Sequence, residues 1–208
     1  MKPRQIDLKN FIGLLLLGVF ALSGCTSKVD PQPSCNFVQN GSLQRVSWKE
    51  ATPVSIYVHD SFPQEYIPVL QSAMQDWEKV IGKPLFRIGG SASGVATPTQ
   101  DGVSEIYWLS DWEPDRSFEQ ARTTIYWEGN HISEADVRVN VKDFQYFTGS
   151  DADANKVDLE SLLVHELGHV LGLQHNTAPG SVMAVNLADA TFRRIPQQVD
   201  IDSVKCEY

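Results

Sequence analysis

Basic residues are scarce in this sequence, with 17 Lys and Arg against 26 Asp and Glu and a formal net charge of −9. Such an acidic chain is a poor partner for nucleic acids, because that binding depends on cations that neutralise phosphates. Long hydrophobic runs are also lacking. The run at residues 11–22 is interrupted by two glycines and falls short of the roughly 20 apolar residues that span a bilayer. The remaining composition fits one globular domain, and we expect a monomer.

The short apolar run has the flanks of an export signal. Three basic residues among the first ten precede it, as in a secretory signal peptide. It ends in Leu22-Ser23-Gly24-Cys25, which resembles the lipobox of bacterial lipoproteins. The resemblance implies cleavage before Cys25, lipidation of its thiol and a membrane anchor made of acyl chains. Thr26 follows where Asp would favour inner-membrane retention, so the outer membrane or cell surface is expected. A plain signal peptide is the alternative.

Three segments follow from this interpretation. Residues 1–24 are the expected signal peptide, residues 25–46 the lipidated cysteine and a tether, and residues 47–208 the folded domain. The tether is expected because residues 26–34 are polar and contain two prolines.

Hydrophobic patterning predicts an α+β fold. Stretches rich in β-branched and aromatic residues predict five strands, at residues 54–59, 85–88, 106–109, 123–127 and 135–141. Apolar residues at steps of three and four predict a helix over residues 64–81. A second helix is expected after Asp158, a suitable N-cap, and a short last one at 196–204. Residues 89–102 are expected to form a loop. The pattern predicts a twisted mixed sheet packed on two long helices.

Residues 165–175 carry the spacing H-E-x-x-H-x-x-G-x-x-H. Residues four apart share one face of a helix, so His165 and His169 can direct ring nitrogens at one metal ion about 2.0–2.1 Å away. Glu166 can reach a water bound to that metal, which is the position of a general base. Gly172 can adopt a positive φ and end the helix, so that the chain folds back and delivers His175.

The ligand set distinguishes catalysis from a structural role. Structural zinc sites are usually closed by four protein ligands. Three histidines leave one coordination position open, and a carboxylate stands beside it. The motif therefore favours a catalytic metal.

The extended motif resembles that of the metzincins, which are zinc endopeptidases with a methionine-containing turn beneath the metal. Ser181-Val182-Met183-Ala184 fits that turn. Its methionine comes eight residues after His175, a spacing similar to that of the matrixin branch. A propeptide of the usual matrixin kind and a histidine set for a second, structural zinc are not apparent.

The resemblance implies a metzincin-like domain with one catalytic Zn²⁺. The three histidines of the motif would hold the metal, and Glu166 would activate zinc-bound water to hydrolyse peptide bonds. Protein or peptide substrates are implied, and they would add as an extra strand to the sheet edge at residues 123–127. Two alternatives remain: a surface lipoprotein that binds a partner without catalysis, and an amidase that cuts cell-wall peptides with the same zinc site.

Two cysteines besides Cys25 are present, Cys35 and Cys206. Export places them in an oxidising compartment, where a pair of thiols usually becomes a disulfide. The alternative is that Cys35 caps the zinc as a latency switch, as in matrixins. The surrounding sequence at residues 33–37 does not match the matrixin motif, so the disulfide is favoured.

Other polar residues receive weaker interpretations. His59 and His131 are expected to be surface or hydrogen-bonded residues, and Asp136 is expected to be structural. Residues 151–155 read Asp-x-Asp-x-Asn, which can begin a calcium loop. The glycine and glutamate that an EF-hand needs further along are missing, so a solvated loop is favoured and calcium binding is the weaker alternative.

Overall fold

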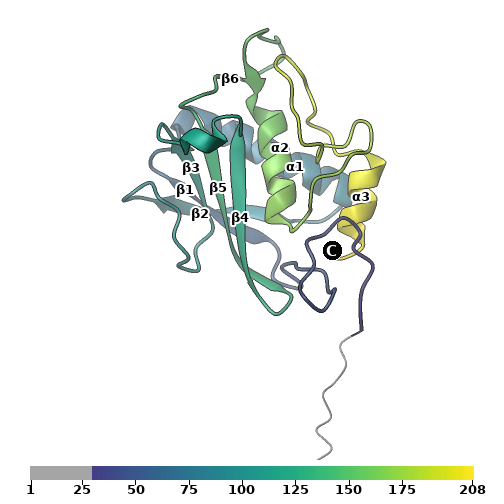
Figure 1. Cartoon of the computed structure of the whole chain (residues 1–208). Coiled ribbons are helices and arrows are strands. Elements are labelled where there is room, and N and C mark those ends of the chain that lie inside the picture. Colours follow the sequence, from purple (N-terminus) through teal and green to yellow (C-terminus); the bar gives the residue numbers. More distant parts are fainter. Residues whose placement is uncertain (1–29) are drawn as a thin grey trace, which may run out of the picture.

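The computed structural model describes residues 30–208 (Figure 1). The expected signal peptide and Cys25 lie outside these residues. Within the described part of the chain, no helix combines the length and the apolar character needed to cross a bilayer.

A mixed five-stranded sheet forms the centre of the domain and confirms the predicted α+β class. Its strands are β1 (Val54–His59), β2 (Phe86–Ala92), β3 (Glu105–Leu109), β4 (Ala121–Glu128) and β5 (His131–Asn140). They are ordered β2-β1-β3-β5-β4, and only β4 runs antiparallel to its neighbour. Strand β4 is therefore an edge strand, at the place where the sequence predicted substrate to add.

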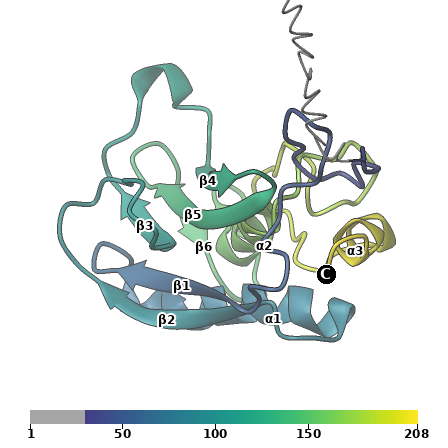
Figure 2. The ribbon, with the colours of Figure 1, turned by 90° about the horizontal axis from the view of Figure 1, so that it is seen from below.

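Two long helices, α1 (Ile67–Ile81) and α2 (Leu159–Val170), share the main hydrophobic core with the sheet (Figures 1 and 2). Trp77 of α1 is fully buried, and its indole nitrogen donates a hydrogen bond of 2.8 Å to the carbonyl of Val164 in α2. Asp158 caps α2 as expected, because its side chain accepts a hydrogen bond from Ser161 N. A short helix, α3 (Gln198–Lys205), comes last.

Several element boundaries differ from the prediction; β5, for example, begins at His131 and not at residue 135. Residues 64–66 form a separate 3-10 turn before α1, which leaves the helix-disfavouring proline in the first turn of α1. Strand β2 continues to Ala92, where a loop was expected. A Cβ atom on Gly89 would lie 2.7 Å from the ring of Tyr57, so the glycine lets the aromatic ring lie on the strand.

A two-stranded pair was not predicted. It consists of β6 (Tyr146–Phe147) and β7 (Val157–Asp158). Strands of two residues carry no readable alternation of polar and apolar side chains, which explains why the sequence pattern missed them.

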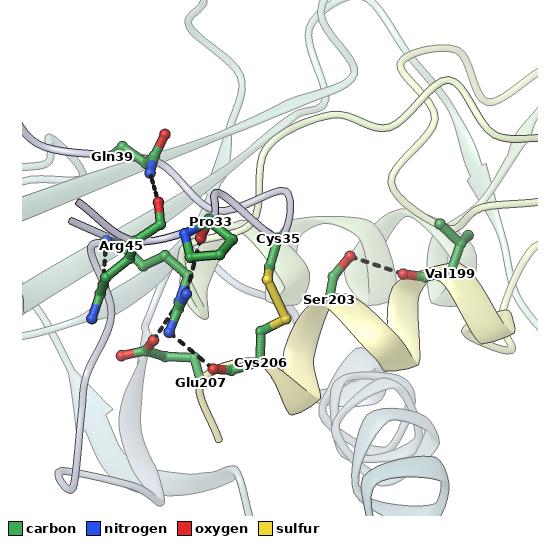
Figure 3. The surroundings of a disulfide bond; sticks show 9 residues. Pro33, Cys35, Gln39, Arg45, Val199, Ser203, Cys206 and Glu207 are labelled. Atoms are coloured by element: carbon green, nitrogen blue, oxygen red, sulfur yellow. Dashed lines mark hydrogen bonds and ion pairs between the residues drawn. A yellow bond between two sulfur atoms is a disulfide. The ribbon is translucent and has the colours of Figure 1, made fainter. Parts of the chain in front are cut away.

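The second half of the expected tether packs on the domain. Phe37 and Val46 are fully buried in the main core. A disulfide joins Cys35 to Cys206, whose Cα atoms are 6.3 Å apart (Figure 3). Arg45 reinforces this junction by donating hydrogen bonds to the carbonyls of Pro33 and Cys206. Burial of apolar side chains stabilises a fold, so Phe37 and Val46 pack as part of the domain.

The face of β5 that points away from the helices carries buried acids. Glu134 accepts a hydrogen bond from the backbone of Gly102, and Asp136 accepts one from the backbone of Glu105. Both carboxylates are about 1% exposed. Burial raises the pKa of Asp136 to about 7.

Replacing both bridged cysteines, Cys35 and Cys206, by serine should lower the free energy of unfolding. The crosslink spans 171 residues, and removing a native disulfide from a small secreted domain typically costs about 2–5 kcal/mol. Denaturant unfolding of the oxidised protein and of the double variant measures this loss. Equal midpoints for the two proteins would show that the crosslink adds no stability.

Asp136→Asn should raise the melting temperature at pH 8 and change it little near pH 4. The pKa of Asp136 in the fold, about 7, lies above its ordinary value of 3.8. Ionisation therefore destabilises the fold progressively as pH rises between these values, and asparagine cannot ionise. Thermal unfolding of both proteins with a chelator present, from pH 4 to pH 8, measures the difference. A parent that gains stability relative to the variant as pH rises would contradict the assignment.

Candidate metal centre

The structure brings the three histidines of the motif together. His165 and His169 lie one turn apart on α2, and His175 comes from the segment that follows the helix. The Nε2 atom of His169 lies 3.1 Å from Nε2 of His165 and 3.2 Å from Nε2 of His175. Within residues 30–208, this is the one group of three or more histidine, cysteine or acidic side chains whose ligand atoms converge.

Backbone carbonyls fix the tautomers of two of these rings. Nδ1 of His165 lies 2.7 Å from the carbonyl oxygen of Val182, and Nδ1 of His169 lies 2.7 Å from that of Leu173. A carbonyl can only accept, so each Nδ1 carries the proton and donates it. In neutral rings the Nε2 atoms then present lone pairs to each other.

These rings fit a zinc ion. Burial lowers the pKa of all three histidines, most strongly that of His165, which favours the neutral, metal-binding form. Facing lone pairs repel one another unless a cation lies between them. Zn–N bonds of 2.0–2.1 Å at a tetrahedral angle put ligand nitrogens about 3.3 Å apart, close to the separations found here.

A turn at Gly172 places the third histidine. Helix α2 ends at Val170, and Gly172 adopts φ +101°, a region that suits glycine. A Cβ atom at this position would lie 2.4 Å from the carbonyl oxygen of Val46. Gly172 is therefore required both for the direction of the chain and for its close approach to the N-terminal segment.

The N-terminal segment holds the chain segment that leads to His175. The amide of Val38 donates to the carbonyl of Gly172 at 2.9 Å. Asn36 binds Gln174 twice: its carbonyl accepts from the amide of Gln174, and its side-chain amide donates to the carbonyl of Gln174, each at 2.7 Å. Nothing in the sequence pattern indicated this role for residues 36–38, because their partners are more than 130 positions away.

Glu166 lies beside the histidines and is held by the edge strand. The hydroxyl of Thr123 in β4 donates a hydrogen bond of 2.6 Å to its carboxylate. Burial raises the pKa of Glu166 to about 7, against the opposing effect of the Thr123 hydrogen bond. The side chain is 4% exposed. A carboxyl group with this pKa can both accept and return a proton near neutral pH.

Met183 packs against helix α2, which carries His165 and His169. Its side chain is fully buried and contacts the helix at Gly168. Asp200 of α3 stabilises the turn, since its carboxylate accepts hydrogen bonds from the hydroxyl of Ser181 and the amide of Val182. The carbonyl of Val182 in turn accepts a hydrogen bond from Nδ1 of His165, so Asp200 supports a candidate metal ligand through two hydrogen bonds.

A cavity of about 550 Å³ opens beside the histidines and Glu166. Its walls are β4, helix α2 and the segment after the methionine turn, with lining residues that include Ala121, Ile125, Leu162, Leu187 and Arg193. The cavity therefore has room for part of a peptide directly beside the three histidines.

Other polar residues named from the sequence lie elsewhere. His59 is buried, with its ring against Tyr107 and its Nδ1 hydrogen-bonded to Ser61, whereas His131 is exposed at the start of β5. Asp153 pairs with Lys156 at 2.9 Å. Calcium binding by residues 151–155 stays a prediction from the sequence.

Gly168→Ala should destabilise the fold. The added Cβ atom would lie 2.2 Å from the sulfur of Met183 and 3.1 Å from Trp77, and overpacking of this kind typically costs about 1–3 kcal/mol. Denaturant unfolding gives the change, and Gly41→Ala is the matched control because a Cβ atom there meets nothing within 4 Å. Equal losses in the two variants would show that the contact with Met183 is unimportant.

Comparisons with known proteins agree with this geometry. The family model described as Matrixin matches residues 54–208. A stretch of 76 residues is 34% identical to matrix metalloproteinase-25 of Mus musculus, covering 35% of this chain and 12% of that protein. The chain thus spans only a small part of that relative. The matrixin match covers the sheet, the helices and all three histidines, and this chain belongs to the matrixin family of metalloproteases.

Proposed function

We propose that this protein is a zinc-dependent endopeptidase whose general base is Glu166. The observation that carries the proposal is the convergence of three imidazole nitrogens next to a buried carboxylate, at the mouth of a cavity. Membership of the matrixin family supports both zinc and peptide substrates.

Zinc, when bound, supplies Lewis-acid chemistry, by which it acidifies water and polarises a carbonyl group. His165, His169 and His175 would hold it. The hydroxyl of Thr123 occupies one oxygen of the Glu166 carboxylate, which leaves the other oxygen to take a proton from the attacking water. Glu166 then returns that proton to the leaving amine.

The edge strand offers a binding surface for an extended peptide. Strand β4 pairs with β5 on one side only, and an unpaired strand edge can accept a further strand by backbone hydrogen bonds. Residues 121–123 and 125 of β4 also line the cavity. A peptide added here would cross the metal centre along its length, which favours cleavage within a chain.

We also propose that the protein is exported and anchored by lipid at Cys25, in the outer membrane or at the cell surface. The lipobox-like tetrad at residues 22–25 supports this. The Cys35–Cys206 disulfide is consistent with an oxidising compartment. Mass spectrometry of the N-terminal peptide from the native host tests it. A free Cys25 thiol or an unprocessed N-terminus would exclude the anchor.

Glu166→Ala should keep zinc and lose cleavage. The histidines remain in place, whereas removal of a general base typically slows a reaction by about 10²–10⁴-fold. The measurements are zinc content and cleavage of a mixed peptide library, with Glu65→Ala as control because Glu65 is exposed on the turn before α1.

Each other outcome favours a different function. Cleavage by Glu166→Ala at the parental rate would exclude Glu166 as the base. A parent that binds zinc and cuts no peptide would favour the non-catalytic binding lipoprotein. Cleavage restricted to cell-wall peptides would favour the amidase.

A further inference from the structure

Arg193 is a cation in the wall of the catalytic cavity. It lines the cavity together with the apolar residues Leu162 and Leu187. Its position is fixed from two sides: its amide donates to the hydroxyl of Ser161 at 2.6 Å, and its guanidinium donates to the carbonyl of Ala184 at 3.1 Å. The backbone of Arg193 is therefore held by α2, and its side chain by the segment that follows the methionine turn.

Arg193 has no carboxylate partner among the described residues. None of the ion pairs within residues 30–208 includes it, whereas its neighbour Arg194 pairs with Asp158 and with Glu160. Asp200 is near enough to act on Arg193 electrostatically. However, the Asp200 oxygens are occupied by Ser181, Val182 and Gln197.

The other charged side chains that line the cavity already have partners. Arg122 and Glu119 form an ion pair with each other, and the Glu166 carboxylate accepts from Thr123. Burial lowers the pKa of Arg193, yet a guanidinium stays protonated in proteins. The cavity therefore holds one cation whose remaining donors are available to a ligand.

From this geometry we infer that the protease selects substrates with glutamate or aspartate at a position flanking the scissile bond, through contact of that carboxylate with Arg193. An arginine can bind a carboxylate through two parallel hydrogen bonds, and such charge-assisted contacts are about twice as strong as neutral ones. A neutral analogue of the ligand leaves the charge of the site unpaired, so such a site also discriminates strongly against that analogue. The inference rests on the proposed peptidase function and adds a substrate class to it.

The first test is cleavage of a mixed peptide library by the purified, zinc-loaded protein, followed by matched peptides that carry Glu or Gln at the selected position. We expect kcat/KM for the Glu peptide to exceed that for the Gln peptide by about tenfold or more. Cleavage without any preference for acidic residues beside the scissile bond would overturn the inference and leave the peptidase function intact.

Variants at Arg193 separate charge from shape. Arg193→Gln should reduce the Glu/Gln ratio of kcat/KM to about 1. Arg193→Glu should instead favour peptides that carry Lys at the same position. Arg194→Gln is the matched control and should keep the parental ratio. An unchanged ratio in folded, zinc-loaded Arg193→Gln would overturn the inference. Should Arg193→Gln fail to fold, Arg193→Lys should keep a preference for acidic peptides, and its loss in that folded variant would also overturn the inference.

Binding to inactive protein keeps the two proposals distinguishable. Zinc-loaded Glu166→Ala should bind the Glu peptide about tenfold more tightly than the Gln peptide, as measured by calorimetry. The same difference in a protein whose parent cuts no peptide would support the role of Arg193 and exclude the peptidase function. Equal affinities for the two peptides would overturn the inference whether or not the parent is active.

Discussion

The reversal of the chain at Gly172 is the constraint on which the metal centre depends. Two ligands come from adjacent turns of α2, but the third has to return toward them within a few residues. Gly172 meets this need with φ +101° and with space for the carbonyl of Val46. Any side chain at this position would meet both an unfavourable backbone region and a steric clash. The position of His175 is therefore set by backbone geometry.

Both ends of the folded chain converge on that turn. Residues 36–38 bind the backbone of residues 172–174, and the disulfide joins this segment to the end of α3. On the other side, Asp200 of α3 holds the methionine turn, whose Val182 carbonyl orients His165. The metal ligands are thus supported by hydrogen bonds from two segments that lie far from them in the sequence, and such support fixes tautomer and ring orientation in metal sites.

The same elements combine chemistry with substrate access. Strand β4 supplies the Thr123 hydroxyl that binds Glu166, and its other edge is the one where we propose that a peptide adds. The segment after the methionine turn closes the cavity from the opposite side and carries Arg193. A protein with a net charge of −9 thereby presents a positive group inside its cavity. The local field at Arg193 therefore differs in sign from the net charge of the chain.

Local sequence patterns were enough to predict the class of fold and to locate the candidate metal site. The histidines, Glu166 and Gly172 are close in sequence, and helical spacing translates directly into geometry over such distances. Strands and helices long enough to show a period were predicted as well, whereas β6, β7 and the extension of β2 were too short or too rich in glycine. In contrast, the three-dimensional structure was needed to reveal the roles of Asn36, Thr123 and Asp200, the packing of residues 35–46, and the position of Arg193. These depend on contacts between residues that are distant in sequence, or on the path of an irregular segment, and no local spacing encodes either.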